Sequence, residues 1–107
     1  MPQPGEIWLA EIPYTNGVAS KLRPVLVLWV GVADVVSVAV TSIAPRAPTD
    51  VPLRDWATEG LRVPSCVRLL RLDSLEQSLF SRKLGVISPA DAIRLRQVWA
   101  DRIQLRF

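Results

Sequence analysis

A proline set directly against an unbroken apolar run is the feature that most constrains how this 107-residue chain can fold. Pro24 precedes Val25, Leu26, Val27 and Leu28, and Arg23 comes just before it. Proline has no N–H and fixes its own φ, so it is typical of the start of a strand and biases the preceding residue towards extended geometry. We therefore expect a buried strand with a firmly held arginine at its mouth. Such a guanidinium offers a rigid fork of donors that matches phosphate or carboxylate.

The rest of the chain predicts short strands, one helix and polar connections. Residues 13–22 predict a polar loop that delivers Ser20, Lys21 and Arg23, because the Asn-Gly pair at 16–17 tolerates positive φ. Valine-rich or alternating segments predict strands at 7–12, 25–30, 35–42, 65–72 and 83–87. The segments 25–30 and 35–42 pair as a hairpin across 31–34. The fold class is mainly β with one α-helix, a small β-barrel with the helix packed on it.

The C-terminal helix has the clearest start in the sequence. Ser88-Pro89-Ala90-Asp91 combines an N-cap serine, a proline at the first helical position and an acidic residue three positions after the cap. Apolar residues then recur at three- and four-residue spacing and form one stripe, made of Ala92, Leu95, Val98, Trp99 and Ile103.

The composition indicates a single globular domain over residues 1–107, with 50% apolar and 21% charged residues. The single cysteine, Cys66, has no partner for an intrachain disulfide, and no histidine exists to activate it. We expect it to be a buried, structural residue. The N-terminus shows no signal peptide, and the apolar stretch 24–40 is short for a membrane span and is broken by Gly31 and Asp34. These features predict a soluble, cytoplasmic protein.

Positive charge is concentrated in the second half of the chain. Residues 1–60 hold four basic and six acidic side chains, whereas residues 61–107 hold nine basic and four acidic ones. Eleven of the 13 cations are arginine, the side chain better suited to bidentate phosphate recognition. This balance favours an anionic partner, although arginines that only solvate the surface fit the count equally well.

Several kinds of catalysis are excluded by what the sequence lacks. The chain has no histidine, which rules out histidine acid–base chemistry, histidine-dependent triads and the common zinc sites. Its ten acidic residues show no clustered ligand spacing, and its five glycines form no nucleotide-binding motif, so no metal or cofactor is implied. Arginine, hydroxyl and carboxylate groups remain. These suffice for cleavage of an RNA phosphodiester, in which the 2′-hydroxyl of the substrate is the nucleophile.

The predicted hairpin brings candidate residues for such chemistry together. Arg23 begins one strand, and Thr41 and Ser42 end the strand paired with it, so a hydroxyl should lie close to the guanidinium. A surface ion pair for Arg23 and ordinary strand packing for Thr41 are the alternatives. A groove for single-stranded RNA is predicted from further cations, with an aromatic ring available for base stacking: Arg46, Arg68, Arg82 and Lys83, with Trp56 or Tyr14.

Five segments, taken in order, resemble one known family. They are GEIWLA at 5–10, RPVLVL at 23–28, VAVTS at 38–42, PSCVR at 64–68 and SRKLG at 81–85, followed by the helix. Together they resemble the PemK/MazF toxins of bacterial type II toxin–antitoxin systems. The resemblance implies a metal-independent endoribonuclease that cuts single-stranded RNA, inhibits translation and growth, forms a homodimer, and is silenced by a cognate antitoxin. It also implies the small barrel of that family.

The resemblance also implies roles for individual residues. Arg23 and Thr41 match the functional arginine and threonine of the family, and Arg71-Leu72-Asp73 matches an Arg-x-Asp motif of some members. Asp73 either accepts the proton or caps a turn that follows. The family's loop histidine and Glu-Gln have no counterpart here, so the acid–base step is unassigned. Protonation of the leaving group falls to Lys21 or to water, because arginine is a weak general acid.

Two other functions stay open on the same scaffold. A related toxin family shares this barrel and poisons DNA gyrase by protein contact, so the fold alone does not fix the activity. A copy that has lost catalysis and binds only antitoxin or nucleic acid is the other alternative, which the missing loop histidine keeps open.

Overall fold

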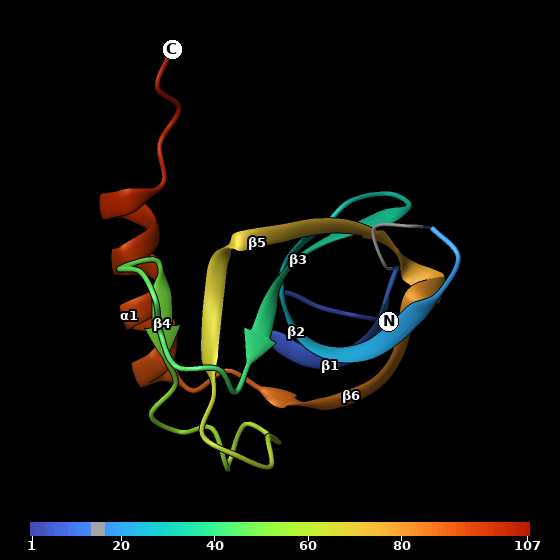
Figure 1. The fold of residues 1–107 in the computed structure, drawn as a ribbon, viewed down its shortest axis with the longest axis horizontal. Helices are drawn as coiled ribbons and strands as arrows, with labels where there is room; N and C mark the ends of the chain where they lie inside the picture. The colour runs from blue at the N-terminus through green and yellow to red at the C-terminus, as the bar shows by residue number, and fades with distance from the viewer. Residues whose placement is uncertain (14–16) are drawn as a thin grey trace.

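The computed structural model describes residues 1–13 and 17–107, and within them six strands form one antiparallel sheet with a single α-helix after it. The elements are β1 (Glu6–Pro13), β2 (Ser20–Val30), β3 (Asp34–Thr41), β4 (Asp50–Pro52), β5 (Cys66–Glu76), a 3-10 turn η1 (Gln77–Leu79), β6 (Phe80–Val86) and α1 (Pro89–Arg102). Figure 1 shows the sheet curling on itself, with α1 outside it beside β4.

The predicted fold class, mainly β with a C-terminal helix, is confirmed. The strand order is β4-β5-β3-β2-β1-β6, and no pairing within the described residues joins β4 to β6. The curled sheet is therefore open along this seam. The predicted hairpin of β2 and β3 is present and is closed by a hydrogen bond from Gly31 N–H to the Asp34 carbonyl at 2.8 Å.

Strand β2 begins earlier than the sequence predicted. It starts at Ser20 instead of Val25, so Ser20, Lys21 and Arg23 lie on a strand and not in a loop, and Pro24 lies inside it. The pairing explains this position. From Ser20 to Pro24 the strand pairs with β1, and its pairing with β3 begins only at Val25. Proline is tolerated where one side of a strand has no neighbour, because no ladder bond is lost there.

Strand β5 bends sharply in its middle (Figure 1). Its pairing with β3 shifts at this point: Val38 lies opposite Leu72, but the next residue, Ala39, lies opposite Arg68. Residues 69–71 are therefore extra on β5, and such an insertion bends a strand. The bend divides β5 into one leg that carries Arg68 and another that carries Asp73.

The helix packs on the sheet through its apolar stripe, as predicted. Ser88 caps it by accepting a hydrogen bond from Asp91 N–H at 3.2 Å, with Pro89 in the first turn. Leu95 is 7% exposed and joins the main core, which consists of Ile7, Leu26, Val38, Val40, Val51, Leu53, Val67, Leu69 and Leu95. Burial of one such leucine stabilises the fold by roughly 1.5–3 kcal/mol. The described residues contain no helix that is both long and apolar enough to cross a membrane.

Next to this core, an apolar groove of about 290 Å³ remains between the sheet and α1. Trp29 of β2 and Trp99 of α1 meet edge to face there, with ring centroids 6.4 Å apart. The name apolar groove is used below for the space lined by Leu26, Leu28, Trp29, Leu69, Leu95, Arg96 and Trp99.

Cys66 is buried, as predicted, with 2% of its surface exposed. Its Sγ donates to the Ile43 carbonyl at 3.4 Å. Burial, together with the charge of Asp50, raises the pKa of the Cys66 thiol. The thiolate form is therefore disfavoured, which is consistent with a structural role.

Candidate nucleic-acid cleft

A cleft of about 480 Å³ opens where the start of β2, the end of β3 and the middle of β6 meet the segment between β4 and β5. We call it the arginine cleft. Its floor and walls include apolar residues such as Leu9, Val40 and Leu84. Its polar side chains come from four separate segments and are Arg23, Thr41, Ser42, Arg62, Ser65 and Arg82. No aspartate or glutamate is among the described residues that line it, so its three guanidiniums create an uncompensated positive field.

Strand register explains how Arg23 and Thr41 come to share this cleft. Val25 of β2 lies opposite Ala39 of β3 at the end of their ladder, and Arg23 and Thr41 each lie two residues beyond this last pair. On the other side of β2, Arg23 lies opposite Ala10 of β1. The predicted hairpin therefore brings the hydroxyl and the guanidinium into one site, and their roles in catalysis stay predictions.

The hydroxyl of Thr41 is oriented by its own turn. Its Oγ1 accepts a hydrogen bond from Ile43 N–H at 3.2 Å. A hydroxyl that accepts in this way keeps its proton for donation to a further acceptor.

Arg82 reaches the cleft from β6, where it lies opposite Leu9 of β1. The pairing of β1 with β6 is irregular on both sides of this pair, with shifts between Ile7 and Trp8 and between Leu9 and Ala10. Such irregularities redirect side chains. The sequence analysis predicts that Arg82 binds RNA, and the structure brings this residue into the same cleft as Arg23.

Arg62 is a cleft residue that the sequence analysis missed. It is exposed and lies in the segment between β4 and β5, with Gly60 and Pro64 close by in the chain. Glycine and proline nearby indicate a turn, and an arginine in a turn is expected to be exposed. Only the fold shows that this turn crosses to the ends of β2 and β3.

Asp73 does not line the cleft. It lies opposite Ser37 of β3, four residues before Thr41, which corresponds to about 13 Å along a strand. The bend in β5 separates it from the leg that pairs with Thr41. No turn follows it either, because β5 continues to Glu76. The Arg-x-Asp match therefore identified a motif that this fold holds away from the arginine cleft.

Other predicted RNA-binding residues also lie outside the cleft lining. Ser20 and Lys21 are exposed at the start of β2, and Arg71 is exposed at the bend of β5. Arg46 lies in the connection after β3, where its N–H donates to Asp50 Oδ2 at 2.9 Å. Lys83 forms an ion pair with Glu6, Nζ to Oε2, at 2.8 Å.

Arg68 is half-buried on β5, next to the thiol of Cys66. Its Nε and Nη2 atoms are buried and have no hydrogen-bond partner in the described part of the chain. Trp56, a candidate for base stacking, packs against the main core instead. Tyr14, the other candidate, lies outside the described residues.

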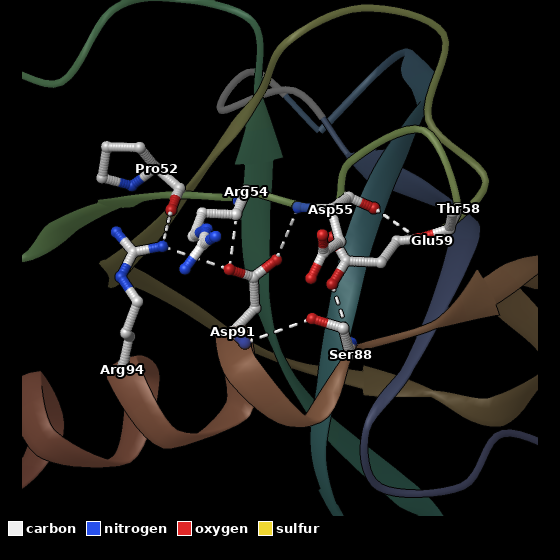
Figure 2. Close-up of polar contacts among 8 residues, drawn as sticks. All are labelled: Pro52, Arg54, Asp55, Thr58, Glu59, Ser88, Asp91 and Arg94. Atoms are coloured by element: carbon white, nitrogen blue, oxygen red, sulfur yellow. Dashed lines mark hydrogen bonds and ion pairs between the residues drawn. The ribbon is translucent and has the colours of Figure 1, made fainter.

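The segment that carries Arg62 is tied to the start of α1 by Asp91 (Figure 2). Asp91 is fully buried, and its two carboxylate oxygens accept hydrogen bonds from the main-chain N–H groups of Arg54 and Asp55, each at 3.0 Å. Arg94 forms an ion pair with it at 3.1 Å and also donates to the Pro52 carbonyl. Burial opposes the charge on Asp91, but these hydrogen bonds outweigh it and keep the pKa of Asp91 below its usual value.

Glu59 makes a second tie between the same two elements. It is also fully buried, and its Oε2 accepts a hydrogen bond from Ser88 N–H at 2.8 Å. Burial, together with the neighbouring Asp91, raises the pKa of Glu59 to about 7. Two buried carboxyl groups at one helix start therefore divide their roles, one charged and one tending to hold a proton.

Comparisons with known proteins agree with this fold. Residues 3–100 match the model of a family described as PemK-like, MazF-like toxins of type II toxin–antitoxin systems. A comparison with curated protein sequences finds no significant match.

Solved structures of similar fold include proteins from mycobacteria and from Deinococcus radiodurans. An endoribonuclease from a mycobacterial species, solved in complex with its cognate antitoxin, has a TM-score of 0.77 and 20% identity over 100% of this chain and 99% of that one. The Mycobacterium tuberculosis toxin MazF-mt6 has a TM-score of 0.75 and 22% identity over 95% and 99%. MazF from Deinococcus radiodurans has a TM-score of 0.70 and 23% identity over 94% of both chains. Because the family match spans nearly the whole sequence, the chain belongs to the PemK-like, MazF-like toxins of type II toxin–antitoxin systems.

Proposed function

We propose that this toxin is an endoribonuclease that cleaves single-stranded RNA in the arginine cleft without a metal ion. The observation that carries the proposal is the convergence of Arg23, Arg62 and Arg82 with Thr41 in one cleft that has no lining carboxylate in the described residues. A field of this sign suits a polyanion. Family membership and the endoribonucleases among the structures of similar fold support the same activity.

The proposed reaction needs charge stabilisation more than a strong base. The 2′-hydroxyl oxygen attacks the adjacent phosphorus, the bond from phosphorus to the 5′-oxygen breaks, and a cyclic phosphate remains on the 5′ fragment. Arg23 stabilises the extra negative charge on the phosphorane, and Thr41 donates a hydrogen bond to one of its oxygens. Water takes the proton of the 2′-hydroxyl and returns one to the 5′-oxygen. A donor in the role proposed for Arg23 contributes roughly 10²- to 10³-fold to the rate.

We also propose the partners that such a toxin needs. A cognate antitoxin with an acidic or disordered segment would cover the positive cleft and block RNA by occupancy, and one similar structure contains its own antitoxin. The chain works as a homodimer in this proposal, and a monomeric molar mass in solution would contradict it. Cleavage of messenger RNA in the cytoplasm then inhibits translation and growth.

The proposal is tested by a cleavage assay on a long single-stranded RNA with EDTA present. The natural chain, Arg23→Ala and a control, Arg106→Ala on the exposed C-terminal tail, are compared, and the cut ends are mapped. We expect discrete cuts by the natural chain and the control, and a rate about 10²- to 10³-fold lower for Arg23→Ala. Equal cleavage by Arg23→Ala would contradict the assignment, and absence of cuts by all three would favour the binding alternative.

A further inference from the structure

Glu59 is a buried acid that the proposed reaction does not use. It directly precedes Gly60, which lines the arginine cleft. Its Oε2 accepts from Ser88 N–H, but its Oε1 is buried and has no hydrogen-bond partner among the described residues. The carboxyl of Asp91 interacts with Glu59. Figure 2 shows both side chains near the start of α1. A buried polar atom without a partner is costly and calls for an explanation.

A proton on Oε1 of Glu59 supplies that explanation. The Asp91 oxygens already accept hydrogen bonds from two main-chain N–H groups and face Arg94, so Asp91 is the group that stays charged. With a proton, Glu59 Oε1 becomes a donor to Asp91, and the repulsion of two carboxylates becomes a hydrogen bond. Without it, two negative charges face each other in a buried site.

A short and closely packed piece of main chain connects the hydrogen-bonded Glu59 to the arginine cleft. Gly60, the next residue, lines the cleft and has a φ of +92°. A Cβ at Gly60 would clash with the Leu84 carbonyl, and a Cβ at Gly85 would clash with the Glu59 carbonyl. The main chain at 59–60 therefore lies directly on β6. Only Leu61 lies between this contact and Arg62, so a displacement of Glu59 would shift the main chain that carries Arg62.

We propose that Glu59 is a positioning residue for RNA binding: its protonated carboxyl holds the segment 53–65 against the start of α1 and so fixes Arg62 in the arginine cleft. Glu59 does not touch the substrate and acts only through Arg62. The identity of the ligand rests on the proposed function, but the link from Glu59 to Arg62 does not.

The proposal has a definite direction with pH. The groups that face Glu59 are Asp91 of α1 and Ser88, the N-cap of that helix, with Arg94 acting through Asp91. Strand β6 contributes main chain at Leu84 and Gly85. Burial raises the pKa of Glu59 from 4.5 to about 7, so the folded chain binds this proton more tightly than the unfolded chain. The stabilising contribution therefore decreases as pH rises from about 4.5 and is lost above about 7. RNA binding should weaken over the upper part of this range.

The first test compares the pH profile of KM for RNA cleavage between pH 6 and 8.5. Glu59→Gln keeps the contacts at every pH, because an amide accepts from Ser88 N–H and donates to Asp91. The control is Glu76→Gln, an exposed carboxylate at the far end of β5. We expect KM to rise about fivefold or more in the natural chain and in the control, with a smaller change in kcat, and to stay flat in Glu59→Gln. If KM of Glu59→Gln rises with pH as much as KM of the natural chain, the proposal is wrong.

A second measurement separates this proposal from the proposed function. The amide resonances of Ser88 and Arg62 are followed by NMR over the same pH range in the natural chain, without RNA. We expect both to titrate together near pH 7, and neither to do so in Glu59→Gln. If the chain cuts no RNA at any pH, the proposed function fails while this titration still decides the role of Glu59. An Arg62 amide that does not follow Ser88 in the natural chain overturns the positioning role, and this reading needs no variant to fold.

Discussion

The arginine cleft and the apolar groove share one strand but are built in different ways. The first half of β2 gives Arg23 to the cleft, and its second half gives Leu26, Leu28 and Trp29 to the groove. The cleft is made of residues from β1, β2, β3 and β6 and the segment between β4 and β5, whereas the groove is made of residues from β2, β5 and the helix. The shape of the cleft therefore depends on the hydrogen bonds that hold the segment 53–65, whereas the shape of the groove depends on apolar packing.

The two regions also differ in charge. Three arginines and no carboxylate line the described part of the cleft, while Arg96 is the one charged residue among the described residues that line the groove. Exposed apolar surface in the groove is a consequence of packing around Leu95 and the two tryptophans. We expect substitutions in the groove to change stability and substitutions in the cleft to change activity, and three changes test this division.

The largest effect should come from Leu95→Ala in the groove. Leu95 is 7% exposed within the main core, so its truncation leaves a cavity and lowers the free energy of unfolding by about 3 kcal/mol. Denaturant unfolding measures this loss. Leu105→Ala, on the exposed tail, is the control and should change stability little. Cleavage per folded molecule should be unchanged, and a large fall in it would break the division between the two regions.

Gly60→Ala should have a smaller effect, and it should change both stability and activity. The φ of +92° and the closeness of the Leu84 carbonyl make any side chain strained there, at about 2 kcal/mol in the free energy of unfolding. Because Gly60 also lines the cleft, KM should rise along with the loss of stability. Gly17→Ala is a matched control, since its φ is also positive, at 71°, but open space surrounds it. A normal KM in Gly60→Ala would show that the cleft wall tolerates displacement.

The smallest effect should be that of Arg62→Ala, compared with Arg96→Ala. The first removes a guanidinium from the cleft and the second removes one from the groove. Loss of one phosphate contact should raise KM about fivefold and reduce the slope of log affinity against log salt concentration by about 0.7. Binding of a non-cleavable RNA at several salt concentrations measures both. Equal salt slopes for the two variants would contradict RNA binding in the arginine cleft.

The sequence predicted the elements whose cause is local. The hairpin of β2 and β3, the Ser88 cap and the apolar stripe of α1 follow from turn residues, capping and periodicity, and all are present. The presence of Arg23 and Thr41 in one cleft was predictable because a hairpin brings the outer ends of its two strands together. The family resemblance rested on the same local segments.

The other features of the fold and the site depend on contacts between residues far apart in the sequence, which no local pattern encodes. The early start of β2 depends on the absence of β3 beside Pro24, and the position of Asp73 depends on a bend in β5 produced by three extra residues. Arg62 reaches the cleft because Glu59 and Asp91 hold its segment on a helix more than 20 residues later in the chain. Asp91 was recognised as a helix-start acid, but its hydrogen bonds to Arg54 and Asp55 were not predictable from its spacing.

The ties of the cleft wall run from buried carboxyl groups to main-chain N–H groups, at Arg54, Asp55 and Ser88. Main-chain donors are present whatever side chain a position carries, with the exception of proline. The exposed tip of the wall, residues 62–64, can therefore change in sequence without loosening the wall, because Glu59, Gly60 and Asp91 keep it in place. A library that randomises only this tip would offer a direct route to toxins that cut different RNA sequences on an unchanged framework.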